Sequence, residues 1–203
     1  MKHVHTIVAA LGFGFAIAIG GHVNHAEADG GIASNSQLRG QYAGTESGGC
    51  LAATSGFNPN LTPIVATTSY STLVSADVVF TFDGYGRGTA NFTNIDIRVP
   101  GPNAFGPQAT VSNGLNNNFT YSVGPKNTVT VTFAYLTFNL VGGPSAGFTA
   151  TINQLVLDGQ FGPNGVTVVE NDGAIETVSV SNGVSYSRIC GRAFVLLNSR
   201  AGF

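Results

Sequence analysis

The side chains that most often carry out catalysis are unevenly distributed in this chain of 203 residues. There is no tryptophan, and all histidines lie near the N-terminus, at His3, His5, His22 and His25. Ser-His-Asp and Cys-His systems need imidazole, as do most zinc, copper and non-haem iron sites. The sequence beyond residue 25 therefore predicts no cofactor and no metal centre. This composition counts against an enzyme without deciding the question.

Carboxylates are the remaining candidates for catalysis, because two acids about 5 to 10 Å apart in a cleft can act as general acid and base. Asp83, Asp158 and Asp172 each precede a glycine, which is the usual position of an aspartate in a turn. Glu46 precedes a Ser-Gly-Gly turn, and the other acids flank or occupy predicted strands. No pair of acids stands out, so we name no catalytic residue.

Cys50 and Cys190 are the only cysteines, and an even number of cysteines in an exported protein predicts a disulfide. Such a bond would close a loop of about 140 residues, for which the chain-entropy model gives on the order of 4 to 5 kcal/mol. It would also bring the first and last ordered segments together. The alternative is two free thiols.

The N-terminal segment has the pattern of a secretory leader. Lys2 gives a basic start, residues 6–19 are uncharged and mostly apolar, and Ala26-Glu27-Ala28 resembles a signal-peptidase site. The apolar run is shorter than the roughly 20 residues of a membrane-spanning helix. We expect residues 1–28 to be a signal peptide and the protein to be secreted or periplasmic, with no membrane insertion after cleavage. An uncleaved anchor or a buried helix is the alternative.

Cleavage would leave 175 of the 203 residues, enough for one domain with a sizeable core. We expect a flexible segment at 29–37 and a single domain at 38–203. Seven basic and nine acidic residues give this part a formal charge of −2 and no basic stripe, so a nucleic-acid partner is not expected. The sequence does not indicate an oligomeric state.

Alternation of apolar and polar residues with period two, broken by Gly, Asn, Asp and Pro clusters, predicts an antiparallel all-β domain. The expected hairpins span 78–92, 119–135, 155–169 and 174–190, and further strands are expected at 39–46, 136–141, 147–154 and 193–197, which makes about nine or ten strands. Residues 51–68 and 100–118 hold most of the prolines and are expected to be long loops, either functional or simply tolerated insertions.

One predicted strand changes phase, because Phe92 is apolar at an even position whereas Ile95, Ile97 and Val99 are apolar at odd positions. A β-bulge near Thr93 and Asn94 would place all four side chains on one face. Short hairpin links favour an up-and-down arrangement, either a closed barrel or a two-sheet sandwich. We favour the barrel, because joining Cys50 to Cys190 suits a sheet whose ends meet.

Three short segments carry a family resemblance: LRGQY at 38–42, FTFDGYGRGTA at 80–90 and RICGR at 188–192. They resemble small secreted bacterial β-barrel proteins of uncharacterised function, whose layout is similar to that of lipocalins. Gly40 and Tyr42 stand where lipocalins carry Gly-x-Trp, and Arg192 stands where they place an arginine near the last strand. The resemblance implies a barrel with an apolar cavity and no catalytic chemistry.

Aromatic residues at inward strand positions either fill the core or line a cavity for a small apolar ligand. Arg188 and Arg192 either anchor an acidic group of such a ligand or brace the mouth of the barrel. The candidate ligand-binding residues are Tyr42, Phe82, Tyr121, Phe133, Tyr135, Arg188 and Arg192. The competing interpretation is a structural or surface-interaction protein with a filled core.

Overall fold

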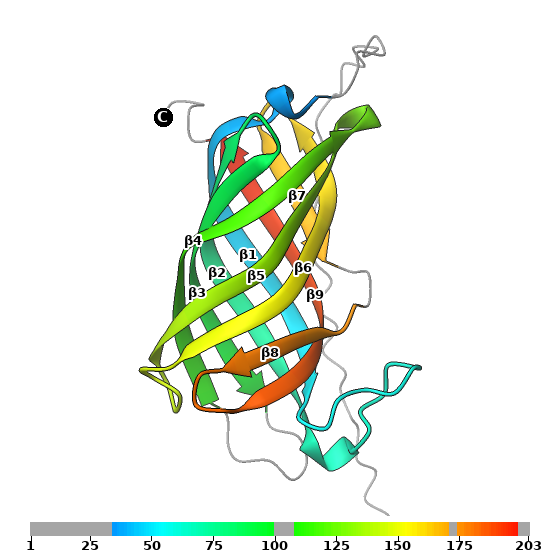
Figure 1. Ribbon diagram of the computed structural model, residues 1–203, viewed down its shortest axis with the longest axis vertical. Helices are drawn as coiled ribbons and strands as arrows, with labels where there is room; N and C mark the ends of the chain where they lie inside the picture. The colour runs from blue at the N-terminus through cyan, green and yellow to red at the C-terminus, as the bar shows by residue number, and fades with distance from the viewer. Residues whose placement is uncertain (1–33, 100–107, 171–173, 199–203) are drawn as a thin grey trace, which may run out of the picture. The chain divides into compact units, whose positions relative to one another are not determined.

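The computed structural model describes residues 34–99, 108–170 and 174–198, so the predicted signal peptide lies outside the described residues. These residues form an antiparallel β-barrel (Figure 1). Its strands are β1 (Arg39–Ala53), β2 (Ser69–Asp83), β3 (Arg87–Val99), β4 (Gln108–Gly124), β5 (Thr128–Gly142), β6 (Thr149–Gly162), β7 (Gly165–Glu170), β8 (Glu176–Val180) and β9 (Ser185–Asn198). Short 3-10 turns occur at η1 (Asn35–Gln37), η2 (Ala66–Thr68) and η3 (Pro125–Asn127).

The sheet closes on itself. Each strand from β1 to β6 pairs with the next, and β9 pairs with β1 from Tyr42↔Asn198 to Ala53↔Ser187. Both β7 and β8 lie between β6 and β9, one beyond the other, so the nine strands fill eight positions around the barrel. Closure removes the unpaired strand edges of an open sheet. The prediction of a barrel rather than a sandwich is confirmed.

All four predicted hairpins are present, and the nine strands agree with the expected nine or ten, although several are longer than expected. The segments 136–141 and 193–197 are parts of β5 and β9, and the segment 147–154 belongs to β6 from Thr149 onward. The loop expected at 51–68 covers 54–68, since β1 continues to Ala53. The loop expected at 100–118 is wrong for residues 108–118, which belong to β4, while 100–107 lie outside the described residues. Residues 35–37 form a turn capped by Ser34, within the segment predicted to be flexible.

The two ends of the barrel differ, and we name them by their contents. The β2–β3, β4–β5 and β6–β7 connections lie at the aromatic end, which is uppermost in Figure 1. The β1–β2 loop and the β5–β6 and β8–β9 turns lie at the opposite, cavity end.

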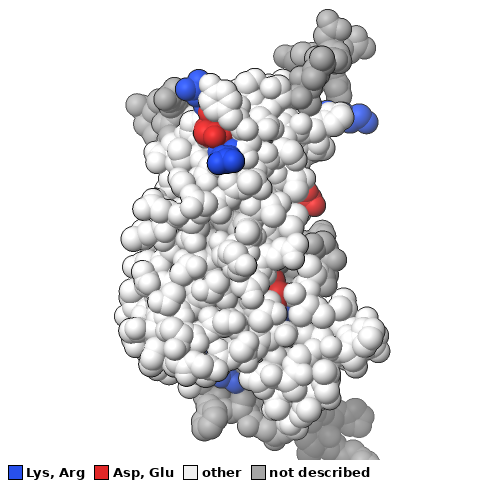
Figure 2. Space-filling model, viewed as in Figure 1, with Lys and Arg blue, Asp and Glu red and all other residues white. Residues whose placement is uncertain are grey.

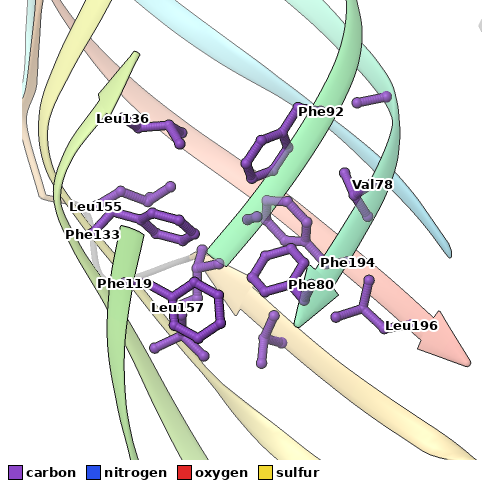
Figure 3. Close-up of a cluster of buried hydrophobic side chains, with 14 of the residues drawn as sticks. Val78, Phe80, Phe92, Phe119, Phe133, Leu136, Leu155, Leu157, Phe194 and Leu196 are labelled. Atoms are coloured by element: carbon purple, nitrogen blue, oxygen red, sulfur yellow. The ribbon is translucent and has the colours of Figure 1, made fainter. Parts of the chain in front are cut away.

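A cluster of phenylalanine side chains fills the aromatic end (Figure 3). The ring of Phe80 is fully buried and lies 5.4 Å from that of Phe119 and 5.9 Å from that of Phe133, between centroids. Gly88 permits this packing, because the Phe119 ring occupies the space that a β-carbon at Gly88 would need. Burying each phenylalanine contributes about 1.5–3 kcal/mol, so this half of the interior is a packed core.

The N-terminal turn closes the aromatic end. Leu38 is completely buried, and the Tyr121 hydroxyl donates to the Leu38 carbonyl at 2.8 Å while accepting from the Gly84 amide at 2.9 Å. The Asn35 side chain accepts from the Val123 amide at 2.9 Å. These bonds tie η1 to the β2–β3 turn and to β4.

On β3 the inward side chains become polar beyond this core, although the strand keeps its phase. Along β3, Phe92 is followed inward by Asn94 and Asp96, while Ile95 and Ile97 face outward and are nearly half exposed. The bulge predicted near Thr93 and Asn94 is therefore wrong, because β3 pairs with β2 in unbroken register from Gly88 to Val99. The register of β3 with β4 does shift, but between Ala90 and Phe92. The prediction assumed that apolar side chains must point inward along the whole strand.

The outer wall carries few charges. Figure 2 shows a mostly uncharged face, with charged side chains gathered near the aromatic end and scattered more sparsely below it. Outward aliphatic side chains near the cavity end include Leu51, Leu73, Ile95, Ile97 and Val99. The residues that the structure describes include no helix of the length and hydropathy needed to cross a membrane.

Candidate ligand-binding cavity

The cavity end holds a cavity of about 270 Å³ inside the barrel. Its walls differ in chemistry. The side chains from β5, β6 and β8 are apolar: Phe138, Leu140, Ala150, Ile152, Val178 and Val180. Apart from Ala52, the side chains from β1 to β4 and β9 are polar or charged and include Glu46, Tyr70, Thr72, Asn94, Asp96, Arg98, Thr110, Ser112, Tyr186, Arg188 and Arg192. Such a two-sided cavity suits a molecule with one apolar and one polar side.

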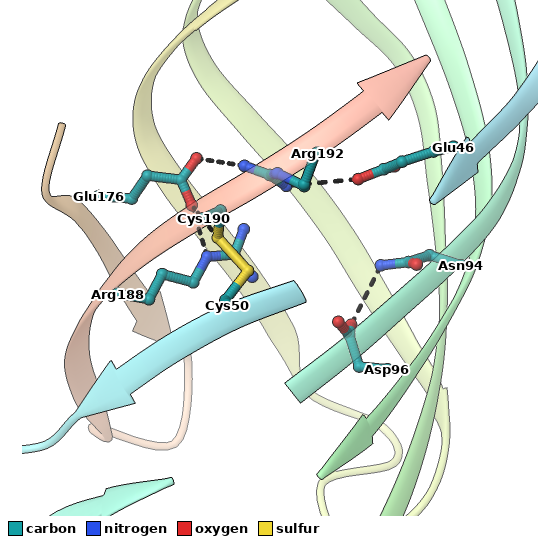
Figure 4. The surroundings of a disulfide bond; sticks show 8 residues. All are labelled: Glu46, Cys50, Asn94, Asp96, Glu176, Arg188, Cys190 and Arg192. Carbon is teal, nitrogen blue, oxygen red and sulfur yellow. Dashed lines mark hydrogen bonds and ion pairs between the residues drawn. A yellow bond between two sulfur atoms is a disulfide. The ribbon is translucent and has the colours of Figure 1, made fainter. Parts of the chain in front are cut away.

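Glu176 holds the two arginines of β9 in place (Figure 4). Its side chain is 1% exposed, and its two carboxylate oxygens accept separately from Arg188 Nε and Arg192 Nη2, each at 2.5 Å. The pairing Glu176↔Arg188 between β8 and β9 sets up this contact. Because Glu176 does not line the cavity whereas both arginines do, it acts as a counter-ion behind them.

Glu46 lies on the other side of Arg192. Its Oε1 is 3.6 Å from Arg192 Nη1, which makes an ion pair longer than a hydrogen bond. Burial raises the pKa of Glu46 despite the opposing effect of Arg192 and Arg188. The carboxyl group of Glu46 is thus a weakly held partner of the arginine pair.

A second polar group lies on β2 and β3. Asn94 Nδ2 donates to Asp96 Oδ2 at 3.0 Å, and the Arg98 guanidinium stacks 3.7 Å above the Tyr70 ring. Burial raises the pKa of Asp96, although Arg188 and Arg192 lower it in part. Burial also raises the pKa values of Tyr70 and Tyr186, so these phenols remain protonated at neutral pH.

Five buried polar atoms of the cavity lining lack a hydrogen-bond partner among the described residues: Glu46 Oε1, Asn94 Oδ1, Asp96 Oδ1, Arg98 Nε and Arg188 Nη2. Buried polar atoms in folded proteins nearly always have a partner, which is another protein group, water or a ligand. Their concentration in one cavity is the arrangement expected where water or the polar group of a ligand completes their hydrogen bonds.

The predicted disulfide is present beside this cluster. Cys50 and Cys190 face each other in the β1–β9 pairing and are joined by a disulfide (Figure 4). Cys190 Sγ lies 3.5 Å from Glu176 Oε2. The bond fixes β9 to β1 between Arg188 and Arg192, and so it holds the segment that presents both arginines to the cavity.

The seven predicted site residues divide into three groups. Tyr42, Phe82, Tyr121 and Phe133 are buried in the packed aromatic end and do not line the cavity. Arg188 and Arg192 do line it. Tyr135, expected to point inward, is 66% exposed on the outer wall.

The inward orientation expected for Tyr135 is wrong because three neighbouring strands change phase at one level. Ala134 and Tyr135 of β5 are both exposed, as are the pairs 115–116 on β4 and 153–154 on β6. Asn116 and Gln154 adopt left-handed backbone conformations with φ of 53° and 54°. The irregularity shifts the alternation, so that Leu136 instead of Tyr135 faces the interior.

The residues that the sequence analysis did not select are Glu46, Tyr70, Asp96 and Arg98, which line the cavity, and Glu176, which holds both arginines from behind. Strict alternation carries the signal for several of them: the inward even positions of β3 run from Phe92 to Arg98, and those of β9 run from Tyr186 to Leu196. The described residues contain no group of three His, Cys, Asp or Glu side chains placed to hold a metal ion.

No protein-family model, curated protein or solved structure matches this chain. The functional argument therefore rests on the geometry of the cavity.

Proposed function

We propose that this protein is an exported binding protein that carries a small, largely apolar molecule with one polar group in its cavity end. The leader-like residues 1–28 and the disulfide support export, since structural disulfides persist in oxidising compartments. The lipocalin-like layout is part of this proposal. The cavity is close to the lower limit of the roughly 300–1,000 Å³ of small-molecule sites, so the ligand is small.

One observation carries the proposal: buried polar atoms without partners face an apolar wall across a single cavity. A purely apolar ligand would leave those atoms unpaired, at a cost of about 1–3 kcal/mol for each one. A fully hydrophilic ligand would gain nothing from Phe138, Ile152 and Val178. A molecule with an apolar part and a polar group can pack against the apolar wall and hydrogen-bond to the polar wall at the same time.

Native mass spectrometry of the protein purified from its own source tests this proposal. We expect a bound small molecule, and we expect Ala150→Phe to reduce its occupancy, because Ala150 is a buried lining residue and a phenyl group there would fill the cavity. Thr151→Phe is the matched control, since the neighbouring side chain is not part of the lining. Occupancy that is equal in the two variants would place the ligand elsewhere, and no bound molecule in either would contradict the proposal.

The alternative, a surface-interaction protein, draws on the outward aliphatic residues. Leu73 and Ile97 are paired across β2 and β3 and are each about half exposed. Sedimentation analysis of Leu73→Ser distinguishes the two functions, because loss of an association without loss of ligand would favour the surface.

A further inference from the structure

The charged groups of the cavity restrict the charge of its ligand. Arg98, Arg188 and Arg192 face three carboxyl groups, those of Glu46, Asp96 and Glu176. Arginine stays protonated in proteins, whereas a carboxylate can take up a proton. Among the described residues, this set therefore has zero net charge when every acid is ionised, and it becomes positive with each acid that is protonated. It does not become negative.

The acids differ in how readily they can be protonated. Glu176 bonds to two arginines, and a charge-assisted pair on each oxygen favours its carboxylate form. Glu46 and Asp96 each have a buried oxygen without a hydrogen-bond partner. Protonation of these two would bring the set from zero to +2. An anionic ligand can thus be neutralised here, whereas a cationic ligand would stand unbalanced beside the arginines.

Glu46 is the group that an anion would displace. It lies 3.6 Å from Arg192, and the neighbouring Arg188 Nη2 has no hydrogen-bond partner. We propose that the ligand carries a carboxylate, that this group replaces Glu46 as the partner of Arg192 and bonds Arg188, and that Glu46 takes up one proton from solvent as the ligand binds. No covalent bond changes in this step. The inference rests on the proposed function, since it assigns the polar group of the same ligand.

The charged groups facing Glu46 determine the direction of the pH effect. Arg188 and Arg192 on β9 favour its ionised form, whereas Asp96 on β3 and Glu176 on β8 favour its neutral form. A bound carboxylate adds a further negative charge and engages both arginines, so it raises the pKa of Glu46 above that in the free protein. Affinity for the anion therefore falls as pH rises, by at most about tenfold per pH unit for one linked proton.

Three probes that share the same apolar chain and differ only in their polar group test the preference for a carboxylate: 4-phenylbutyrate, 4-phenylbutyramide and 4-phenylbutylamine. We expect the carboxylate to bind the full-length wild-type protein at least about tenfold more tightly than the amide, and the amine to bind most weakly. Equal or tighter binding of the amide or the amine would overturn the carboxylate assignment while leaving the cavity a ligand site. Binding of none of the three would count against the proposed function itself.

Calorimetry in two buffers of different ionisation enthalpy measures the number of protons that the protein takes up when the ligand binds. For the wild type we expect uptake of up to one proton with 4-phenylbutyrate at a pH where Glu46 is ionised in the free protein, and for Glu46→Gln we expect this uptake to be lost with binding retained. Asp77→Asn is the matched control, because Asp77 is an exposed carboxylate on the outer face of the adjacent β2. Unchanged uptake in Glu46→Gln, or no uptake in the wild type at any pH between 4 and 8, would overturn the proton coupling. The wild-type pH series decides this even if the variant does not fold.

Discussion

Loss of the Cys50–Cys190 disulfide is expected to lower the free energy of unfolding by about 5 kcal/mol. The two cysteines are 140 residues apart in sequence. The chain-entropy relation for a loop of that length gives about 17 cal/mol/K, or about 5 kcal/mol at 25 °C. Since small domains are stable by only about 5–15 kcal/mol, this bond represents a large share of the total stability.

The Cys50–Cys190 disulfide is best removed in two ways, because each way has a different side effect. Cys50→Ala with Cys190→Ala removes two buried sulfur atoms as well as the cross-link. Reduction of the wild type keeps the sulfur atoms and removes only the bond. Agreement between the two to within about 1 kcal/mol would assign the effect to the cross-link, while a larger loss in the double variant would measure the packing of the sulfurs.

Urea unfolding gives the free energy, and thermal unfolding provides a second measure. For a domain of this size about 1 kcal/mol shifts Tm by roughly 2–4 °C, so a decrease of about 10–20 °C is expected. The reductant should have no effect on the double variant. A loss below about 2 kcal/mol in both forms would refute the reasoning, because it would mean that the unfolded chain already keeps β1 and β9 close together or that the bond strains the folded state.

Two further predictions concern the buried charges. Glu176→Gln should lower the free energy of unfolding by about 3–5 kcal/mol, because it leaves two buried arginines without their shared counter-ion. Urea unfolding measures this loss, and Asp158→Asn on the exposed face of β6 is the control. A loss no larger than that of the control would contradict the prediction. The raised pKa of Glu46 means that the folded state binds a proton more readily than the unfolded state. The contribution of this proton to the free energy of unfolding is therefore complete below the ordinary pKa of 4.5, and it is lost as pH rises through the raised pKa. The stability of the wild type relative to Glu46→Gln should therefore fall as pH rises above about 4.5, whereas a constant or rising difference would show that the ionised form is the one stabilised by folding.

The sequence was informative wherever structure is determined locally. Gly84 and Gly183 adopt positive φ in turns that their neighbours mark clearly, and every predicted hairpin is present. It was misleading where the orientation of a side chain depends on the neighbouring strands. The prolines of 100–118 indicate a loop, whereas residues 108–118 form part of β4 and present Ser112 and Asn117 to the interior.

The candidate site was partly predictable for the same reason. Arg188 and Arg192 both belong to the RICGR segment that carries the family resemblance, but their partners come from β1 and β8, which no local pattern connects to them. The placement of Glu176 depends on the interruption between β7 and β8. The pairs Glu170↔Arg192 and Glu176↔Arg188 lie six positions apart in sequence on the β7–β8 side but only four positions apart on β9. Such an insertion has no signature in the hydrophobic pattern.

The division of the barrel into two ends explains how a small domain can keep a charged cavity. Six ionisable groups inside a barrel are costly, because their desolvation is only partly offset by pairing. The Phe80 cluster at the aromatic end and the disulfide at the cavity end stabilise the fold and so offset this desolvation. If the buried charges served stability alone, apolar residues of similar size would do as well or better. Their location around the cavity, with Arg188 Nη2 and Asp96 Oδ1 unsatisfied, is instead the arrangement expected where a ligand completes the network.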